Sequence, residues 1–288
     1  MNTASMSSSA NATASATATP AASAPSTALS TAAKAHPSAP VHVPSLHGPG
    51  PDEAWRELLR AAREPYRQSG RVAWHFARGK LSCDPVFRGL LERGAIPPRA
   101  RVLDIGCGQG LLASLLAAVD AAQAHGRWPA AWQAAPVAVR YTGIELMPRE
   151  VARAEGALAG LARPPKFVCA DMCEAAFPAS DVVVILDVLH YVDLAAQQAL
   201  LGRVRDALLP HGRLLLRVAD SADWRGSAAS QWVDRIVTLL RRHHLAPMFC
   251  RSLAEWVALL ERLGFVVHSV PMSRGTPFAN LLLAADLR

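Results

Sequence analysis

The stretch that decides the fold is Arg101-Val-Leu-Asp-Ile-Gly-Cys-Gly-Gln-Gly110. Its first half is a short apolar run of the kind that forms a buried strand, and its second half carries glycine at alternate positions. Glycine has no Cβ atom, so such a backbone turns sharply and lets a ligand approach the main chain closely. The pattern predicts a strand, a tight turn and a helix start, with a small-molecule site at the turn.

Beyond Pro97-Pro98, short β-type runs alternate with helical runs, which is typical of a mostly parallel sheet with crossover helices. The expected strands are residues 101–105, 138–145, 166–170, 181–186 and 212–218, and the expected helices between them are 109–122, 148–161 and 193–208. After residue 219 we expect helices near 229–242 and at 252–262, then a hairpin-like pair of strands at 265–270 and 279–287. Residues 120–137 are longer than a usual connection, so we interpret them as an insertion.

The N-terminal region differs in composition from the rest. Residues 1–50 are almost wholly Ala, Ser, Thr and Pro, which predicts a disordered tail. A first helix is expected from Pro51, where acidic residues precede apolar residues at helical spacing, and a second from Asp84 to Gly94. We therefore divide the chain into a tail (1–50), an N-terminal helical cap (51–98) and a main domain (99–288).

Composition narrows the class of protein. The 288 residues are 51% hydrophobic and carry a net charge of +7, but the basic residues form no blocks, which favours a solvated basic surface over a nucleic-acid-binding patch. No apolar run is long enough to span a bilayer. The five cysteines include no CxxC pair, which predicts reduced thiols, a cytoplasmic location and no metal site.

Two acidic residues follow the second and third expected strands. Glu145 should lie beside the glycine turn, where its carboxylate can accept both hydroxyls of a ribose; alternatively it is a surface residue that opens the next helix. Asp171 can accept the amino group of an adenine while Met172 packs on the ring; alternatively Asp171 caps a helix.

The runs VLDIGCGQG, YTGIELMPREVARAE, CADMCEAAFP, DVVVILDVLHYVD and LLPHGRLLLRVAD resemble the successive motifs of class I S-adenosylmethionine-dependent methyltransferases. The resemblance covers about residues 70–288. It implies an α/β, Rossmann-like sheet of seven strands in the order 3-2-1-4-5-7-6, with strand 7 antiparallel and helices on both faces. More loosely, the chain resembles stand-alone methyltransferases of bacterial aryl polyene and polyketide-like pathways.

The resemblance also implies S-adenosylmethionine as the cofactor. Asp104 would position its ammonium end, the glycine backbone would accommodate its methionine part, Glu145 would bind the ribose, and Leu146, Asp171 and Met172 would surround the adenine. The expected cofactor-binding residues are Asp104, Gly106, Cys107, Gly108, Gly110, Glu145, Leu146, Asp171, Met172 and Asp187.

The catalytic candidates are His190 and Tyr191, which follow the fourth strand. A histidine titrates near neutrality, so His190 is suited to act as a general base; alternatively it packs beside the cofactor. Tyr191 is either a wall of the pocket or a hydrogen-bond donor. The aromatic residues of the segment 66–80 either cover the site or form a satellite cluster. We expect the acceptor side to be lined by Arg217, Asp220, Trp224 and Trp232.

Together these features predict methyl transfer to a small organic acceptor, free or tethered to an acidic carrier protein docked on the basic surface. One alternative is an RNA or protein methyltransferase. It is disfavoured because strand four ends in LDVLHYVD rather than an Asn/Asp-Pro-Pro-aromatic motif, and because no RNA-binding module is visible. The other alternative is a NAD-dependent oxidoreductase or a non-catalytic binding domain of the same fold.

Overall fold

The computed structural model describes residues 49–219, 249–272 and 280–288. The tail that was predicted to be disordered lies outside the described residues, except for its last two residues. The helix expected near 229–242 also lies outside them, as do three expected acceptor-side residues, Asp220, Trp224 and Trp232.

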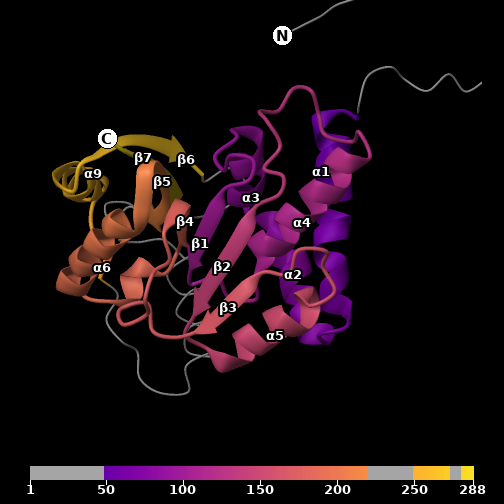
Figure 1. Cartoon of the computed structure of the whole chain (residues 1–288), viewed down its shortest axis with the longest axis horizontal. Helices are drawn as coiled ribbons and strands as arrows, with labels where there is room; N and C mark the ends of the chain where they lie inside the picture. The colour runs from indigo at the N-terminus through magenta and orange to yellow at the C-terminus, as the bar shows by residue number, and fades with distance from the viewer. Residues whose placement is uncertain (1–48, 220–248, 273–279) are drawn as a thin grey trace, which may run out of the picture. The chain divides into compact units, whose positions relative to one another are not determined.

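Seven strands form one sheet in the order β3-β2-β1-β4-β5-β7-β6, and β7 runs antiparallel to both of its neighbours while the other pairs are parallel (Figure 1). This confirms the expected topology. The strands are β1 (Arg101–Ile105), β2 (Arg140–Glu145), β3 (Lys166–Cys169), β4 (Ser180–Leu186), β5 (Leu208–Ala219), β6 (Phe265–Pro271) and β7 (Asn280–Leu287).

The described helices are α1 (Pro51–Arg63), η1 (Glu64–Arg67), α2 (Arg71–Cys83), α3 (Pro85–Glu92), α4 (Leu111–Ala124), α5 (Pro148–Leu158), η2 (Leu189–Tyr191), α6 (Leu194–Ala207) and α9 (Leu253–Arg262). Their starts follow local chemistry. Helix α1 has proline at its first position and acidic residues in its first turn, and α9 begins with a capping box between Ser252 and Glu255. Asp84 caps α3 by accepting a hydrogen bond from the amide of Val86.

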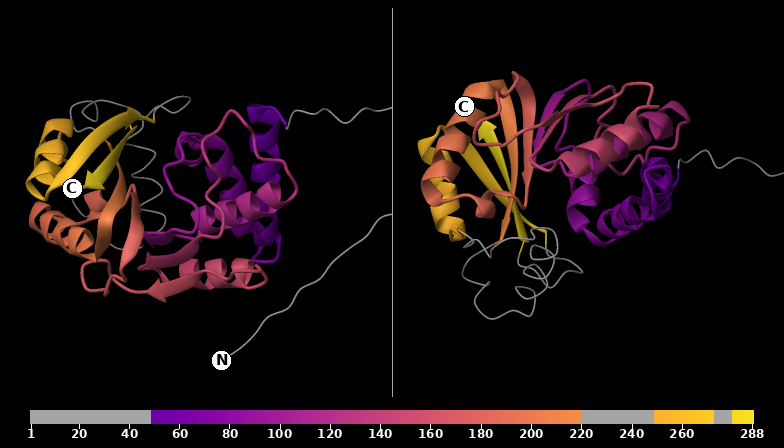
Figure 2. Two further views of the ribbon diagram at one scale, coloured as in Figure 1. Left: turned by 45° about the horizontal axis from the view of Figure 1, so that its top comes forward. Right: turned by 90° about the horizontal axis from the view of Figure 1, so that it is seen from below.

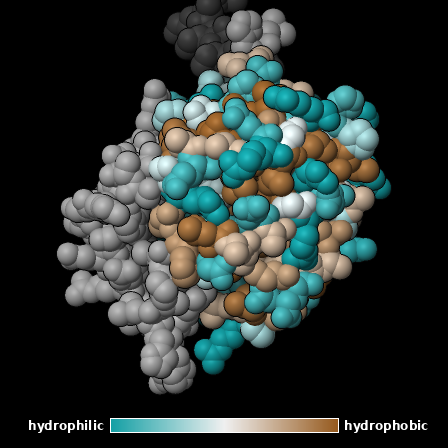
Figure 3. Space-filling view, turned by 90° about the vertical axis from the view of Figure 1, so that its left-hand side faces the viewer, coloured by the Kyte–Doolittle hydropathy of each residue, from teal (hydrophilic) through white to brown (hydrophobic). Residues whose placement is uncertain are grey.

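Strand residues alternate between the two faces of the sheet, and this alternation creates two cores. Val102 and Val182 pack in a cluster with α1, α2, α3 and α4, whereas Leu103 and Val183 pack in a second cluster with α6 and α9. Figure 2 shows the two groups of helices on opposite sides of the sheet. The outer surface on the side of α6 and α9 mixes hydrophilic and hydrophobic residues (Figure 3). No helix among the described residues is long and apolar enough to cross a membrane.

Three elements differ from the sequence expectation. Helix α2 was not expected, because the positions that it buries, Ala73, Ala77 and Leu81, are mostly small and give a weak apolar period. Helix α4 extends to Ala124, so the insertion is shorter than predicted. Strand β5 begins at Leu208, directly after α6, and its pairing with β4 shifts register near Ser180.

The insertion between α4 and β2 packs against the N-terminal helices. Trp132 is buried and meets Trp128 edge to face, with the ring centroids 5.1 Å apart. Arg127 pairs with Glu57 of α1 at 3.0 Å, and the amide of Gln133 donates to the carbonyl of residue 92 at the end of α3. The extra length of this connection is therefore used to anchor α1 and α3 beside the sheet.

Candidate functional site

The glycine turn after β1 has three residues in the left-handed region, with φ of 76° at Gly106, 54° at Gly108 and 71° at Gly110. A Cβ atom at Gly106 would lie 2.5 Å from Val188, and one at Gly110 would lie 2.7 Å from Phe167. A Cβ atom at Gly108 would meet nothing within 4 Å. The outer glycines are thus required by the packing of the chain itself, whereas Gly108 faces open space that a ligand can fill.

Asp104 is the buried carboxylate of this turn, with only 4% of its surface exposed. It accepts a hydrogen bond of 2.5 Å from the hydroxyl of Tyr141 on β2. Burial raises its pKa to about 7, the hydrogen bond from Tyr141 opposes that rise, and the charge of Glu145 adds to it. Among the described residues no Lys or Arg forms an ion pair with Asp104, so its negative charge has no cation to balance it.

Glu145, the last residue of β2, lies against the glycine turn as predicted. One of its carboxylate oxygens accepts from the amide of Gly108 at 3.0 Å, and the other accepts from the amide of Met147 at 2.9 Å. The second contact lies at the start of α5. Glu145 therefore lies both beside the glycine turn and at a helix start, the two positions that the sequence interpretations named; ribose binding stays a prediction. The neighbouring Leu146 is 54% exposed at the same edge of the sheet.

Cys107 turns its thiol away from the open side of the turn. A Cβ atom at Gly143 would lie 2.6 Å from its sulfur, so the thiol fills the space above that glycine. Burial raises the pKa of the Cys107 thiol, and the charges of Asp104 and Glu145 raise it further, which keeps the thiol protonated. Cys107 is therefore available to a ligand through its backbone.

Asp171 follows β3 at the same edge, because Cys169 at the end of β3 pairs with Glu145. Its carboxylate accepts from the amide of Cys173 at 2.8 Å and so caps a short turn, where the alternative interpretation expected a helix start. Met172 packs against the core cluster of α6 and α9, and its carbonyl accepts from Arg203 at 3.1 Å. The Asp171 side chain is exposed and remains accessible to a ligand.

Asp187, directly after β4, has the left-handed φ of 59° that non-glycine residues rarely adopt. Its two carboxylate oxygens accept from Arg217, one of them from Nε at 2.8 Å, and Lys80 lies 3.7 Å away. Arg217 is 2% exposed and also donates to Asp84, including a contact of 2.7 Å. Burial alone would raise the pKa of Asp84, but Arg217 and Lys80 lower it to about 2.

These four residues, Lys80, Asp84, Asp187 and Arg217, form a network that joins α2 to the ends of β4 and β5. Asp84 and Arg217 are 133 residues apart in the chain. Of the expected acceptor-side residues, Arg217 is the one that the structure describes, and it is buried within this network.

His190 and Tyr191 lie in η2, after β4, with their ring centroids 4.1 Å apart and tilted by 53°. The carbonyl of His190 accepts from the amide of Phe249 at 3.0 Å. The buried amide of Gln197 donates to the carbonyls of Leu189 and Phe249, so this turn is held firmly on α6.

The N-terminal helices reach the glycine turn directly. The hydroxyl of the fully buried Tyr66 donates to the carbonyl of Gln109 at 2.8 Å. On α2, Trp74 packs against the main core between the sheet and helices α1 to α4, not in a separate satellite cluster, whereas Phe76 is 47% exposed. Among the described residues no three His, Cys, Asp or Glu side chains gather as a metal site requires.

Sequence reasoning missed Tyr66, Tyr141 and the network partners of Arg217. The signal for Tyr141 was available: a tyrosine in a strand expected to be buried needs a partner for its hydroxyl, and Tyr141 lies on the face of the sheet that also carries Asp104. Lys80 and Asp84 pair with each other at 2.8 Å across one helical turn, but nothing local indicated their second partners, which come from distant strands.

A family described as methyltransferase domain matches residues 73–270. A carboxy-S-adenosyl-L-methionine synthase from Aeromonas salmonicida is 31% identical over 130 residues, which are 44% of this chain and 47% of the relative. The chain thus spans about half the length of that relative.

Two solved structures share the fold. The mitomycin 7-O-methyltransferase superposes with a TM-score of 0.53 at 24% identity, covering 82% of this chain and 67% of that one. A magnesium protoporphyrin IX methyltransferase from Synechocystis PCC 6803 with bound SAH superposes with a TM-score of 0.50 at 20% identity, covering 82% and 94%.

Proposed function

This chain belongs to the methyltransferase domain family, and from that premise we propose that it transfers the methyl group of S-adenosylmethionine to a small organic acceptor. Asp104 carries the proposal, because it is a buried carboxylate without a cation among the described residues, beside a glycine turn. A buried charge is costly unless it is paired. S-adenosylmethionine carries an ammonium and a sulfonium group, so its binding would supply the missing positive charge.

The remaining residues at this edge fit the other parts of the cofactor. The space in front of Gly108 admits the methionine portion, the Glu145 carboxylate lies beside it to accept ribose hydroxyls, and the exposed Leu146 offers an apolar surface to adenine. Asp171 and Met172 would also contact the adenine, and Asp187 would contact the methionine portion. When bound, S-adenosylmethionine supplies an electrophilic methyl group on its sulfonium.

The chain's own contribution to the reaction would be orientation, exclusion of water and proton transfer. His190 would take the proton of the acceptor, and Tyr191 would contact the acceptor beside it. Both lie after β4, the strand next to β1, at the edge that carries the glycine turn. If His190 acts as the base, His190→Gln lowers kcat and removes its pH dependence; if it only packs, the change weakens donor binding instead.

Calorimetry on the full chain tests the donor site. We expect micromolar binding of S-adenosylhomocysteine, at least about tenfold weaker binding of 5′-methylthioadenosine and no binding of NAD. Methylthioadenosine keeps the adenosine and the thioether but lacks the amino-acid end, both ammonium and carboxylate, so the difference reports the binding of that end, which includes the Asp104 contact. Equal affinity for the two thioethers, or binding of NAD, contradicts the proposal.

Methyl transfer itself is tested with donor labelled in the methyl group. The full chain is incubated separately with a metabolite extract, an RNA fraction and a protein fraction. We expect label in the metabolite fraction; label that travels with a small acidic protein and is released by mild base would identify the carrier-tethered acceptor. Label in RNA, or in protein and stable to base, would instead support the RNA or protein alternative. A cytoplasmic location belongs to the same proposal, supported by five free cysteines.

A second candidate is modification of the donor itself, favoured by the 31% identity to a carboxy-S-adenosyl-L-methionine synthase. Such an activity would leave the methyl group in place and change the mass of the donor. Mass spectrometry of the donor recovered from the metabolite incubation separates the two functions. Demethylated donor supports methyl transfer, and donor of increased mass supports the synthase-like activity.

A further inference from the structure

Residues 170–179 connect β3 to β4 and carry Asp171 and Met172, which the proposed function places against the adenine. Connections between parallel strands of one sheet usually contain a helix, whose backbone hydrogen bonds fix its conformation. This connection instead begins with a single turn, in which the amides of Glu174 and Ala175 donate to the carbonyl of Asp171 at 3.0 and 2.8 Å. The next carbonyls of the turn have no continuing helix to bind them.

Arg203 of α6 binds these carbonyls with its guanidinium. One terminal nitrogen, Nη1, donates to the carbonyls of Met172 and Cys173 at 3.1 and 2.6 Å. The other, Nη2, donates to the carbonyl of Ala175. The guanidinium also lies over the ring of Phe177, 4.3 Å from its centroid. One side chain of α6 therefore binds three carbonyls of the turn and the aromatic ring that follows it.

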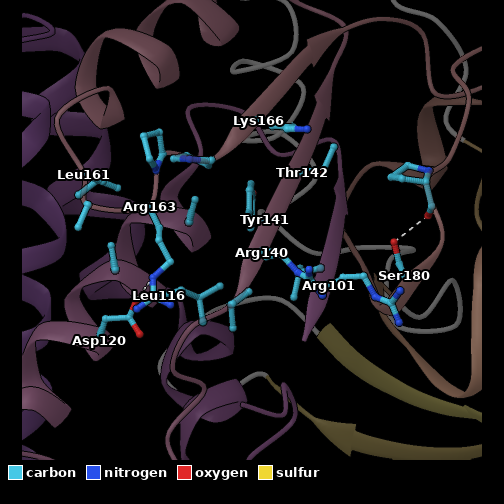
Figure 4. Close-up of a pocket in the computed structure, with 18 of the residues that line it drawn as sticks. Arg101, Leu116, Asp120, Arg140, Tyr141, Thr142, Leu161, Arg163, Lys166 and Ser180 are labelled. Carbon is cyan, nitrogen blue, oxygen red and sulfur yellow. Dashed lines mark hydrogen bonds and ion pairs between the residues drawn. The ribbon is translucent and has the colours of Figure 1, made fainter. Parts of the chain in front are cut away.

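The two ends of this connection are tied to the sheet. At its start, the amide of Ala170 donates to the carbonyl of Glu145, the residue beside the glycine turn, at 3.0 Å. At its end, the hydroxyl of Ser180 donates to the carbonyl of Pro178 at 2.8 Å, as Figure 4 shows. The turn lies between these two attachments, and Arg203 holds it there from a different element of the fold.

A single peptide group links Arg203 to the carboxylate of Asp171. The group that joins Met172 to Cys173 is planar, and its carbonyl and its amide point in opposite directions. Arg203 donates to this carbonyl at 3.1 Å, and the amide of the same group donates to the Asp171 carboxylate at 2.8 Å. Because the group is rigid, the contact on one side sets the direction of the amide on the other. Arg203 therefore orients the Asp171 carboxylate through the peptide group.

We propose that Arg203 is a positioning residue for the adenine of the donor, because it holds the Asp171 carboxylate where that group accepts the exocyclic amino group of the base. The inference rests on the proposed function, which supplies S-adenosylmethionine as the donor and Asp171 as its adenine contact. An ionised carboxylate only accepts hydrogen bonds, so it binds the amino group of adenine but not an oxygen at the same position. Selectivity between these two bases therefore reports whether the carboxylate is correctly placed.

Calorimetry on the full chain with S-adenosylhomocysteine and S-inosylhomocysteine, which has an oxygen in place of the amino group, measures this selectivity. We expect the unaltered chain to bind the adenosine compound at least about tenfold more tightly, and Arg203→Gln to reduce the ratio to about twofold. Asp171→Ala should reduce the ratio to the same value, and adding Arg203→Gln to it should reduce the ratio no further. The matched control is Arg205→Gln on the same helix, which removes an exposed arginine paired with Asp206 and should keep the full ratio.

Arg203→Lys keeps the question open to test if Arg203→Gln does not fold. Lysine keeps the positive charge but lacks the planar fork, so the ratio should fall by about threefold. A lower melting temperature with a full ratio in either folded variant would show that Arg203 only supports the fold, and would overturn the positioning role. Equal binding of the two compounds by the unaltered chain overturns it as well. If the unaltered chain binds neither compound, the proposed function fails together with this inference, whereas a full ratio in the Arg203 variants contradicts this inference alone.

Discussion

Asp104 and Asp187 lie near the same edge of the sheet, on or just after the neighbouring strands β1 and β4, yet their surroundings differ. Asp187 is held by the buried guanidinium of Arg217, with Lys80 nearby. Asp104 is more deeply buried, and within the described part of the chain its side-chain partner is the neutral hydroxyl of Tyr141. One carboxylate is balanced by the protein, and the other is not.

The difference separates a carboxylate whose charge is already balanced within the protein, and whose contact with the donor would be weak, from one whose charge is left for a ligand to balance. A buried ion pair is expensive to break because removal of one partner leaves a charge in a medium of low polarity. A buried carboxylate without a cation can instead keep a proton and stay neutral until a cation binds. The raised pKa of Asp104 corresponds to this protonated state. Replacing each partner in turn tests whether the two carboxylates differ in this way.

The largest effect should follow from Arg217→Met. The change leaves Asp84 and Asp187 with only the partly exposed Lys80 to balance them, so we expect the free energy of unfolding to fall by about 3–5 kcal/mol in urea titrations. The control is Arg213→Met, whose partner Asp286 is partly exposed, and for which the loss should stay below about 1 kcal/mol.

Replacing both acids together with the arginine tests whether unpaired buried charge causes the loss of stability. The triple variant Arg217→Met/Asp84→Asn/Asp187→Asn should recover most of the lost stability, because no charge is left buried without a partner. If Arg217→Met costs no more than the Arg213 control, the network does not stabilise the fold and Asp187 is not balanced in the way described.

The next effect should come from Asp104→Asn, which keeps the shape and an acceptor for Tyr141 but removes the charge. We expect calorimetry to record a loss of at least about 100-fold in affinity for S-adenosylhomocysteine. The free energy of unfolding should be unchanged or higher, since the asparagine carries no charge that must be buried. Asp187→Asn is the matched control and should weaken binding by only about threefold. Equal losses of affinity in Asp104→Asn and Asp187→Asn would contradict the proposed difference between the two carboxylates.

The features that sequence predicted are those set by neighbouring residues. The glycine turn, Glu145 beside it and the strands around it follow from turn chemistry and from the period of apolar residues, which act over a few positions. The order of the strands, with β7 antiparallel, was implied by the family resemblance; the residues themselves indicated only a closing pair of strands.

The features that sequence could not predict depend on the register between distant segments. The sequence indicated only that the Tyr141 hydroxyl needs a partner; the register of β1 and β2 makes that partner Asp104, 37 residues away. Arg217 reaches Asp84 across 133 residues. Asp84 was read only as a helix start, which is its local role, while its second role depends on where β5 places Arg217. Helix α2 was missed because its buried positions are mostly alanine, which gives a weak apolar period.

The smallest effect expected is a pH dependence of donor binding. The pKa of Asp104 is raised to about 7, so at pH 6 most molecules carry a neutral Asp104, and a cationic ligand must displace the proton. The affinity for S-adenosylhomocysteine should therefore rise about tenfold between pH 6 and pH 8. Calorimetry in buffers of different ionisation enthalpy should also record release of a proton on binding near pH 6.

The same shift fixes the sign of the stability change in the ligand-free chain. Between about pH 4 and pH 7 the folded state keeps a proton on Asp104 that the unfolded chain has released, so the free energy of unfolding falls as the pH rises through this window. The shift from 3.8 to about 7 corresponds to about 4 kcal/mol. Asp104→Asn should lose both this slope and the pH dependence of binding. If the slope persists in that variant, another group is responsible, and Asp104 is not the uncompensated carboxylate of the site.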